Sequence, residues 1–384
     1  NVKNTNFTAA EKQDLTDDIK PLLGSSGGGN KNLIINGAMQ VAQRGTSGST
    51  ADGYPSLDRF YTFSNGLDEN PTMSQQSLTS SDTPFSSGFR KYLRFQNGNQ
   101  TSGAGASDQT FFRQAIEAQN VAQSGWNYTS SSSFITLSFW MRASVAQTYY
   151  GLLKATDGGN YIYPFSMALS ADTWTKVTKS IPGNSNLQID DDTGNGLEFV
   201  IYPYLGTSFT DNSVSLNAWA AYSSGTTRTP DHTTTWYTTN DSTIDITGVQ
   251  LEVSSVATDF EHRSFHDDLY KCYRYFQRYA TGDQKPIANG FYYNSTQIKL
   301  TCNLFTTMRT TPTLSHTTGT NYYIIYRDGG LDEFNAFTLE PASDANRCGI
   351  YAHQNISGTS GQTGIVRCQG TAPSGGQIDF SAEL

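Results

Sequence analysis

Short runs of alternating polar and apolar residues dominate the sequence between residues 32 and 265. Side chains of a β-strand point alternately to opposite faces, so this two-residue period predicts strands, and the Gly, Ser, Asn and Asp residues between the runs predict turns. The run 134–142 (FITLSFWMR) shows the pattern most clearly, and one of its two sides is wholly apolar. The residues expected to face a core there are Ile135, Leu137, Phe139 and Met141.

The expected strands recur at spacings that suit two packed sheets, and no helical period interrupts them before residue 266. We therefore expect an all-β fold whose main part is an antiparallel jelly-roll β-sandwich. The glycines in Asn36-Gly37 and at Gly248 predict a tight turn or bulge inside otherwise apolar strands. The strands expected in the sandwich are 33–41, 57–63, 91–95, 110–118, 134–143, 148–154, 173–181, 197–204 and 243–253.

One strong helix is expected at 264–277, where Ser264 suits an N-cap and Asp267 and Asp268 suit the positive end of the helix. This short helix should connect the sandwich to a smaller C-terminal β domain. The strands expected there are 290–293, 298–304, 322–326, 337–339, 348–353, 365–368 and 377–380. The expected divisions are 1–30 for an attachment segment, 31–263 for the jelly roll, 264–282 for the connecting helix and 283–384 for the C-terminal β domain.

Residues 9–23 predict a short amphipathic helix that a Gly/Ser-rich linker separates from the rest of the chain. A helix of this length is marginal by itself, so its apolar stripe is expected to pack on another chain. We expect an N-terminal anchoring helix. The anchoring residues expected are Leu15, Ile19, Leu22 and Leu23.

Composition excludes two classes of partner. The net charge is −9, from 25 Lys and Arg against 34 Asp and Glu, and no Lys/Arg-rich block is present, so binding to nucleic acid is not expected. No apolar run approaches the roughly 18 residues that a membrane helix needs, so insertion into a membrane is not expected.

The four cysteines lie in the last third of the chain without the CxxC spacing of a zinc ribbon. We expect buried free thiols, with one or two disulfides as the alternative. The cysteines are Cys272, Cys302, Cys348 and Cys368.

Enzyme motifs are missing from the sequence, since it contains no nucleophile elbow, phosphate loop or dinucleotide fingerprint. The histidines lack metal-ligand spacing. The segment 190–196 (DDDTGNG) contains a calcium-loop fragment that begins at Asp191, but its twelfth residue is Tyr202 and not Glu, which favours a turn over a calcium site. We expect no cofactor, no metal and no enzyme activity. Paired carboxylates for glycoside cleavage remain an open alternative, because such pairs meet only in the folded chain.

Aromatic residues in polar, loop-like segments are candidate carbohydrate contacts, because sugar rings stack on aromatic faces. The alternative is packing, either in the core or at a fibre interface. The candidate residues are Trp219, Tyr222, Trp236, Tyr237, Tyr322 and Tyr323.

Several sequence blocks, taken in order, resemble those of tail fibre and related virion appendage proteins of tailed bacteriophages that carry a carbohydrate-binding-module-like jelly roll. A weaker match lies at 308–313 (MRTTPT), in the C-terminal part. Arg59 and Arg263, which lie in these blocks, are expected to pair with Glu252 or Glu261. The blocks are 32–45, 57–60, 136–143 (TLSFWMRA), 174–183, 246–252 (ITGVQLE), 257–263 and 269–275.

The resemblance implies a structural protein of the virion, in a tail or capsid appendage. It implies a homotrimer, contacts with other virion proteins through the N-terminus, and a host cell-surface glycan as receptor. The alternatives are a capsid-surface fibre or decoration protein, and a glycan-degrading tailspike.

Overall fold

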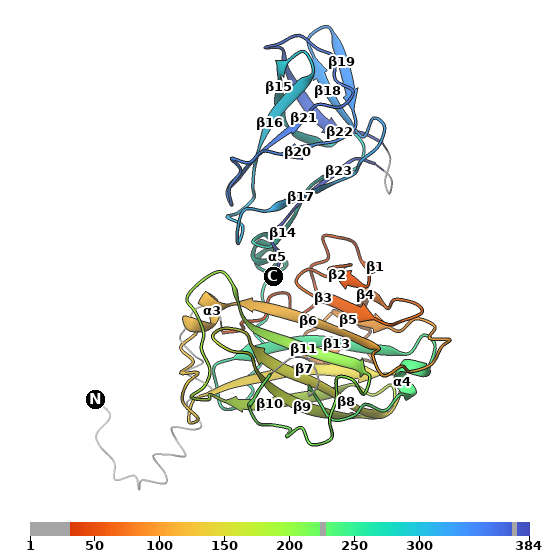
Figure 1. Cartoon of the computed structure of the whole chain (residues 1–384), viewed down its shortest axis with the longest axis vertical. Helices are drawn as coiled ribbons and strands as arrows, with labels where there is room; N and C mark the ends of the chain where they lie inside the picture. The colour runs from red at the N-terminus through yellow and green to blue at the C-terminus, as the bar shows by residue number, and fades with distance from the viewer. Residues whose placement is uncertain (1–30, 223–227, 371–374) are drawn as a thin grey trace, which may run out of the picture.

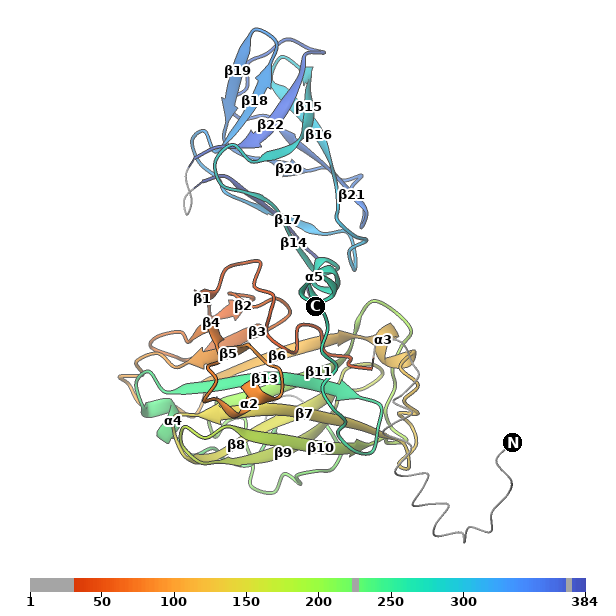
Figure 2. The same cartoon turned by 180° about the vertical axis from the view of Figure 1, so that it is seen from behind.

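The computed structural model describes residues 31–222, 228–370 and 375–384. Two β-rich parts lie end to end, with a short helix at the joint between them (Figure 1). Figure 2 shows the same arrangement from behind. The predicted anchoring residues Leu15, Ile19, Leu22 and Leu23 lie outside the described residues.

The larger part is a sandwich of two sheets. One has six strands, in the order β1-β4-β5-β13-β7-β10, and the other has seven, in the order β12-β9-β8-β11-β6-β3-β2. Neighbouring strands are antiparallel, as β7 is to both β10 and β13. The strands are β1 (Ser47–Ser49), β2 (Asp52–Gly53), β3 (Tyr61–Asn65), β4 (Thr72–Ser77), β5 (Lys91–Gln96), β6 (Gln109–Glu117), β7 (Phe134–Ala143), β8 (Gln147–Ala155), β9 (Tyr161–Leu169), β10 (Thr175–Pro182), β11 (Asn195–Leu205), β12 (Ala220–Ala221) and β13 (Thr243–Glu252).

The two sheets enclose a large apolar core, to which β13 and every strand from β4 to β11 contribute. The four residues predicted to face inward from β7 are at most 1% exposed, so the predicted alternation of that strand is confirmed. The expected all-β fold with an antiparallel jelly-roll sandwich is likewise confirmed. In the described part of the sandwich, three one-turn helices lie between strands: α2 (Thr83–Ser86), α3 (Ala118–Ala122) and α4 (Thr235–Thr238).

The glycine signals have a structural basis. Gly248 adopts a φ of +64°, and the register of β13 against β7 shifts between Thr247 and Gln250, which is the predicted bulge. Beside it, a Cβ on Gly37 would lie 2.1 Å from the carbonyl oxygen of Val249, so only glycine fits at this close approach.

The strand predicted at 33–41 is wrong, because this buried segment is irregular. Asn36 and Met39 both have a φ of +59°, which breaks the extended conformation. The side chain of Asn36 accepts a hydrogen bond from the Val41 amide at 2.9 Å and donates to the Val41 carbonyl at 2.8 Å, so it closes the loop on itself.

The helix at the joint is α5 (Phe265–Tyr273), and the side chain of Ser264 caps it by accepting from the Asp267 amide, as predicted. It ends earlier than predicted, since the chain is extended again from Phe276. The C-terminal part forms a three-stranded sheet, β14-β23-β17, and a seven-stranded sheet, β19-β18-β22-β15-β16-β21-β20. These strands are β14 (Phe276–Thr281), β15 (Pro286–Asn294), β16 (Gln297–Asn303), β17 (Thr313–His316), β18 (Tyr323–Arg327), β19 (Gly330–Phe334), β20 (Thr338–Leu339), β21 (Arg347–Ala352), β22 (Thr363–Cys368) and β23 (Gln377–Ser381).

The cysteines are buried free thiols, as expected. Cys302 and Cys348 lie opposite each other on β16 and β21, inside the C-terminal core. Burial raises the pKa of the Cys302 thiol to about 12, so this sulfur remains protonated at neutral pH. None of the helices among the described residues is long and apolar enough to span a membrane.

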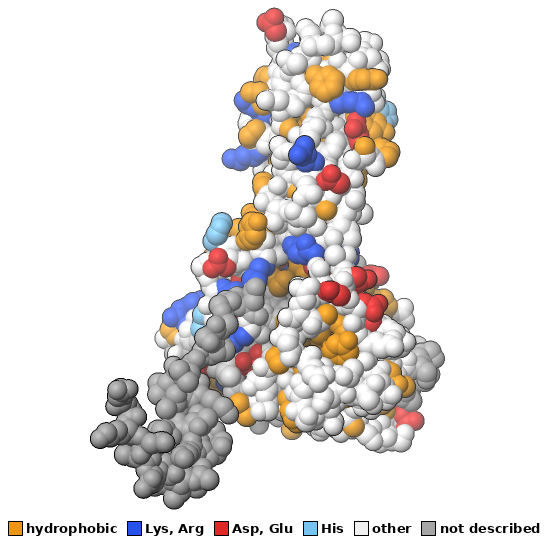
Figure 3. All heavy atoms as spheres, turned by 90° about the vertical axis from the view of Figure 1, so that its left-hand side faces the viewer, with side chains coloured by type: hydrophobic (Ala, Val, Ile, Leu, Met, Phe, Trp, Pro, Cys, Tyr) orange, Lys and Arg blue, Asp and Glu red, His pale blue; other side chains and the backbone are white. Residues whose placement is uncertain are grey.

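Buried charges join the two parts where the molecule narrows (Figure 3). Glu383, beyond β23, forms an ion pair with Arg59 of the sandwich and a second one with Arg44 at 3.1 Å. The guanidinium of Arg59 lies 3.4 Å from the ring centroid of Tyr275, and the Tyr54 hydroxyl donates to the Leu384 carbonyl at 2.6 Å.

The ion pairs predicted for the two recognised arginines are half right. Arg263 pairs with Glu261 at 2.7 Å, as expected. Arg59 pairs with Glu383 instead of Glu252 or Glu261, because it points into the joint and not along the edge of the sandwich.

Glu383→Gln is expected to destabilise the protein by about 3 kcal/mol, since it leaves the Arg59 charge buried without its counter-ion. For a chain of 384 residues this corresponds to a fall in Tm of roughly 4 °C. The matched control is Glu340→Gln, which removes a half-exposed pair with Lys299 (2.8 Å) and should cost less than about 1 kcal/mol. Calorimetry on both variants is the measurement, and equal Tm values would contradict a structural role for the joint.

Candidate functional site

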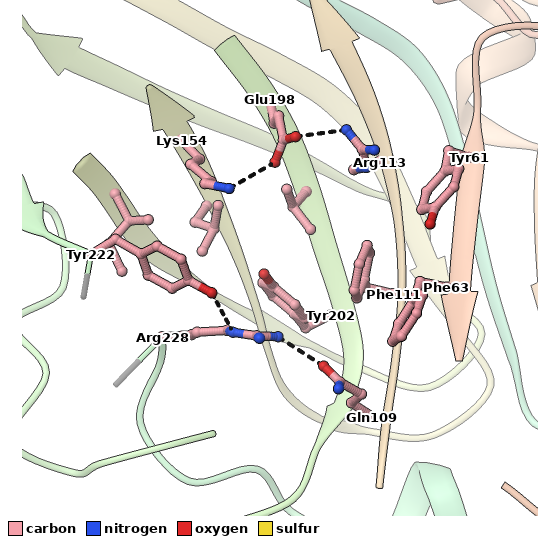
Figure 4. Close-up of a pocket in the computed structure, with 13 residues that line it drawn as sticks. Tyr61, Phe63, Gln109, Phe111, Arg113, Lys154, Glu198, Tyr202, Tyr222 and Arg228 are labelled. Atoms are coloured by element: carbon pink, nitrogen blue, oxygen red, sulfur yellow. Dashed lines mark hydrogen bonds and ion pairs between the residues drawn. The ribbon is translucent and has the colours of Figure 1, made fainter. Parts of the chain in front are cut away.

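A polar cavity lies on the outer face of the seven-stranded sheet of the sandwich (Figure 4). It has a volume of about 310 Å³, which is at the lower end of the range for small-ligand sites. Five strands and one loop line it. The lining residues are Tyr61, Phe63, Gln109, Phe111, Arg113, Leu152, Lys154, Ile162, Glu198, Val200, Tyr202, Tyr222 and Arg228.

Strand alternation explains why these side chains meet. Phe112 on β6 and Phe199 and Ile201 on β11 point into the core, so the residues between them must point outward. The register then places neighbours side by side: Phe63 faces Phe111 across β3 and β6, and Glu198 faces Lys154 across β11 and β8.

Aromatic rings form one wall of the pocket. Phe63 stacks on Phe111 with ring centroids 5.4 Å apart, and Phe111 meets Tyr202 edge to face at 5.5 Å. Tyr61, Phe63 and Phe111 are half-buried, so part of each ring reaches solvent, whereas Tyr202 is buried in the floor. Burial and a hydrogen bond to Asp52 raise the pKa of Tyr61 to about 12, so its hydroxyl is neutral at physiological pH.

Charged groups occupy the end of the pocket beside β8 and β11. Glu198 accepts from Arg113 at 2.6 Å and pairs with Lys154 at 3.6 Å. The side-chain amide of Asn195 also donates to Glu198, at 2.6 Å. The carboxylate is therefore fully engaged and orients both cations.

Arg228 lies on the other side of Tyr222 from Lys154 (Figure 4). Its Nε donates to the Tyr222 hydroxyl at 3.1 Å, and one of its terminal nitrogens donates to the Gln109 side chain at 2.8 Å. Figure 4 shows Tyr222 between Lys154 and Arg228. The pocket thus offers aromatic faces next to several hydrogen-bond donors, an arrangement suited to a polar ring such as a sugar.

Tyr222 is the one predicted carbohydrate residue that lines this pocket. Trp219 is half-buried and packs against the main core, with its indole N–H donating to the Pro182 carbonyl at 2.7 Å. Packing against the core and this hydrogen bond therefore explain the position of the Trp219 side chain.

Trp236 and Tyr237 are wrong as carbohydrate residues, because they are 0% and 1% exposed. They belong to α4, which plugs one end of the sandwich, and Tyr237 stacks on Tyr204 at 4.3 Å. Its hydroxyl reaches Asp108 at 3.0 Å. These rings hold the core together and cannot contact a ligand.

Tyr323 is also wrong, since it is 0% exposed inside the C-terminal core and donates to the Gln377 carbonyl at 2.7 Å. Tyr322 is half-buried and packs on the same core. The structure therefore does not bring the six predicted aromatics together in one site.

A second hollow, of about 630 Å³, lies on the C-terminal part, along β15 and β16. Its lining includes Phe291, which is 43% exposed, and the ion pair between Lys299 and Glu340. Its two charges neutralise each other, so its charged groups offer less to an ionic ligand than those of the sandwich pocket.

Within the described residues, no group of three or more His, Cys, Asp or Glu side chains could hold a metal ion. The acidic segment at 190–196 forms bends that lead into β11.

Fold and pocket together define a two-part all-β protein whose sandwich carries a cationic, aromatic-walled cavity on an outer sheet face. No protein-family model matches the sequence, and no curated protein does.

Several solved structures are similar at low identity. One is a putative sugar binding protein from Bacteroides thetaiotaomicron VPI-5482, with 11% identity and a TM-score of 0.31, covering 58% of this chain and 100% of that chain. Another is the enzymatically active domain of tailspike protein 4 from bacteriophage CBA120, with 10% identity and a TM-score of 0.30, covering 58% of this chain and 22% of that chain. A third is a family 11 carbohydrate-binding module of a Clostridium thermocellum cellulase, with 10% identity and a TM-score of 0.26, covering 56% and 98%.

His232, near the loop that carries Arg228, is expected to make folding stability depend on pH. It lies four residues after Arg228, bonds the Thr229 hydroxyl at 3.0 Å and packs on Tyr150 at 4.9 Å. Burial lowers its pKa from 6.5 to about 3. Below pH 6.5 the His232 side chain therefore binds a proton in the unfolded chain but not in the folded chain. The neutral His232 thus costs no folding stability above pH 6.5, and the free energy of unfolding decreases as the pH falls below that value.

Between pH 6.5 and 5, His232 is expected to account for about 2 kcal/mol of lost stability. His232→Asn should flatten the dependence of Tm on pH over this range, whereas His266→Asn, at an exposed residue, should leave it unchanged. Melting curves at half-unit pH steps make the comparison. An unaltered slope in the His232 variant would show that this histidine is not held neutral.

Proposed function

We propose that this chain is a non-enzymatic structural subunit of a virion appendage, most specifically a phage tail fibre, and that it binds a host-surface glycan in the sandwich pocket. The observation that carries the binding proposal is the wall of half-exposed rings beside buried hydrogen-bonding groups. Sugars offer both C–H faces and hydroxyls, and this wall can contact both at once.

The virion role rests on the ordered sequence blocks that resemble phage appendage proteins. In this proposal the segment 1–30 contacts another virion protein and the C-terminal part extends beyond the sandwich. The end-to-end arrangement supports it, since an elongated chain suits a fibre (Figure 1). This proposal places recognition in the sandwich, because its pocket combines aromatic rings with several hydrogen-bond donors.

Phe63→Ala and Tyr222→Ala are each expected to weaken glycan binding roughly tenfold, about 1.4 kcal/mol, by removing a stacking face. Binding of the purified full chain to host-cell envelopes, followed by isothermal titration with released glycans, is the measurement. Phe265→Ala is the matched control, because that side chain is 54% exposed on α5 and far in sequence from the pocket residues.

Phe291→Ala tests the second hollow in the same assay. If this variant loses binding while Phe63→Ala retains it, the glycan site lies on the C-terminal part. If neither variant loses binding, neither cavity is the glycan site.

A homotrimer is part of the proposal. The C-terminal sheet supports it, because Tyr326 lies opposite both Leu331 and Ile365, and these three apolar side chains are 37%, 52% and 42% exposed. A row of exposed apolar groups across adjacent strands is costly unless a partner covers it.

Multi-angle light scattering at micromolar concentration is expected to give three times the 42.0 kDa mass of the chain. Leu331→Lys should shift the mass toward that of the single chain, since it places a charge in the covered row. A wild-type mass of one chain at this concentration would refute the trimer.

A further inference from the structure

The charge of the sandwich pocket opposes that of the whole chain. Its lining holds three cationic side chains, Arg113, Lys154 and Arg228, against one carboxylate, Glu198. The chain itself has 25 Lys and Arg against 34 Asp and Glu. Chance composition would therefore favour an acidic cavity, and the pocket has an excess of two positive charges.

Glu198 cannot balance these cations. Its contacts with Arg113 at 2.6 Å and Asn195 at 2.6 Å occupy one oxygen, and Lys154 lies 3.6 Å from the other. Glu198 is 9% exposed, so this carboxylate neutralises one cation and leaves little of its surface to a ligand.

Arg228 has neutral hydrogen-bond partners, the Tyr222 hydroxyl and the Gln109 side chain. It also lies over the ring of Phe209 at 5.0 Å. Among the described residues no carboxylate lies within ion-pair distance of Arg228, although its side chain is half-buried. A guanidinium has five N–H donors, so these two hydrogen bonds leave others unused.

The two cations that Glu198 does not fully neutralise surround one ring. Lys154 Nζ lies 5.2 Å and Arg228 Cζ lies 5.9 Å from the ring centroid of Tyr222. Both cations therefore attract an anionic group that binds beside this ring, while the wall of Phe63 and Phe111 remains available for a sugar ring.

We propose that the pocket recognises a sugar residue that carries a carboxylate, with Arg228 and Lys154 as its cationic partners. This step rests on the proposed glycan-binding function and specifies its ligand class. Arg228 presents a planar pair of N–H groups to the planar carboxylate, and the sugar ring lies against the aromatic wall.

The overall charge of the chain favours a glycan ligand with widely spaced carboxylates over a ligand with densely spaced negative charges. A net charge of −9 repels a closely spaced phosphate backbone, whereas a glycan with one carboxylate per repeating unit presents a single charge to the pocket. The cavity of about 310 Å³ has room for roughly one or two sugar residues.

The test uses the full chain and a panel of bacterial surface polysaccharides, neutral and acidic, with each acidic polymer also in its carboxyl-reduced form. We expect binding to at least one acidic polymer, a loss of tenfold or more on carboxyl reduction, and weaker binding as salt rises from 50 to about 300 mM. Sulfated dextran serves as a polyanion without carboxylates.

Arg228→Gln should reproduce the effect of carboxyl reduction, with a loss of tenfold or more for the native polymer and little change for the reduced one. The matched control is Arg90→Gln, which removes the same charge from an exposed residue next to β5. Circular dichroism and Tm of both variants establish that each is folded. Lys154→Met provides a second variant if Arg228→Gln does not fold.

The outcomes separate the two proposals. If the bound polymers are neutral, if the reduced form binds as well as the native form, or if sulfated dextran binds equally well, the carboxylate assignment is wrong while glycan binding stands. If no polymer binds and Phe63→Ala has no effect on binding to envelopes, the proposed glycan function fails and this inference fails with it.

Discussion

The pairing of Arg59 with Glu383 is the interaction on which the arrangement of the two parts depends. Arg59 is 1% exposed and has a φ of +73°, a left-handed conformation that costs about 1 kcal/mol for a residue other than glycine. The backbone adopts it because the side chain then points into the joint, onto the face of Tyr275 and toward Glu383. Neither charge has another ionic partner of equal burial, so removing either side chain would leave the other charge buried without its counter-ion.

With this joint, the C-terminal part does not cover the outer face of the seven-stranded sheet of the sandwich (Figure 1). That face is not polar throughout, since Leu152, Val200 and Tyr202 form a second, smaller apolar cluster on it. Aromatic side chains from one strand and a loop cover this cluster in part. The pocket is the space that this partial cover leaves, so the cavity follows from a sheet whose outer face is partly apolar.

Much of the fold could be predicted from the two-residue period, because burial on one face of a strand leaves a local mark in the sequence. The predicted and observed bounds of β7 agree, β6 lies one residue earlier than predicted, and β13 ends one residue earlier. By contrast, β9 was not predicted, since Pro164 lies in its middle and normally argues against a strand. The partner of Arg59 was beyond prediction, because Glu383 is 324 residues away in the sequence.

The candidate site was harder to predict, for a physical reason that Trp236 and Tyr222 illustrate. Both lie in polar, loop-rich sequence, yet Trp236 is buried and Tyr222 lines the pocket, and only tertiary packing distinguishes them. The rings of Phe63, Phe111 and Tyr202 meet through strand order and register, which no local pattern contains. The net charge of the chain is also a poor guide to the ligand of the pocket. It argues against a long polyanion that contacts the whole surface, but a few side chains set the electrostatic potential inside a small pocket.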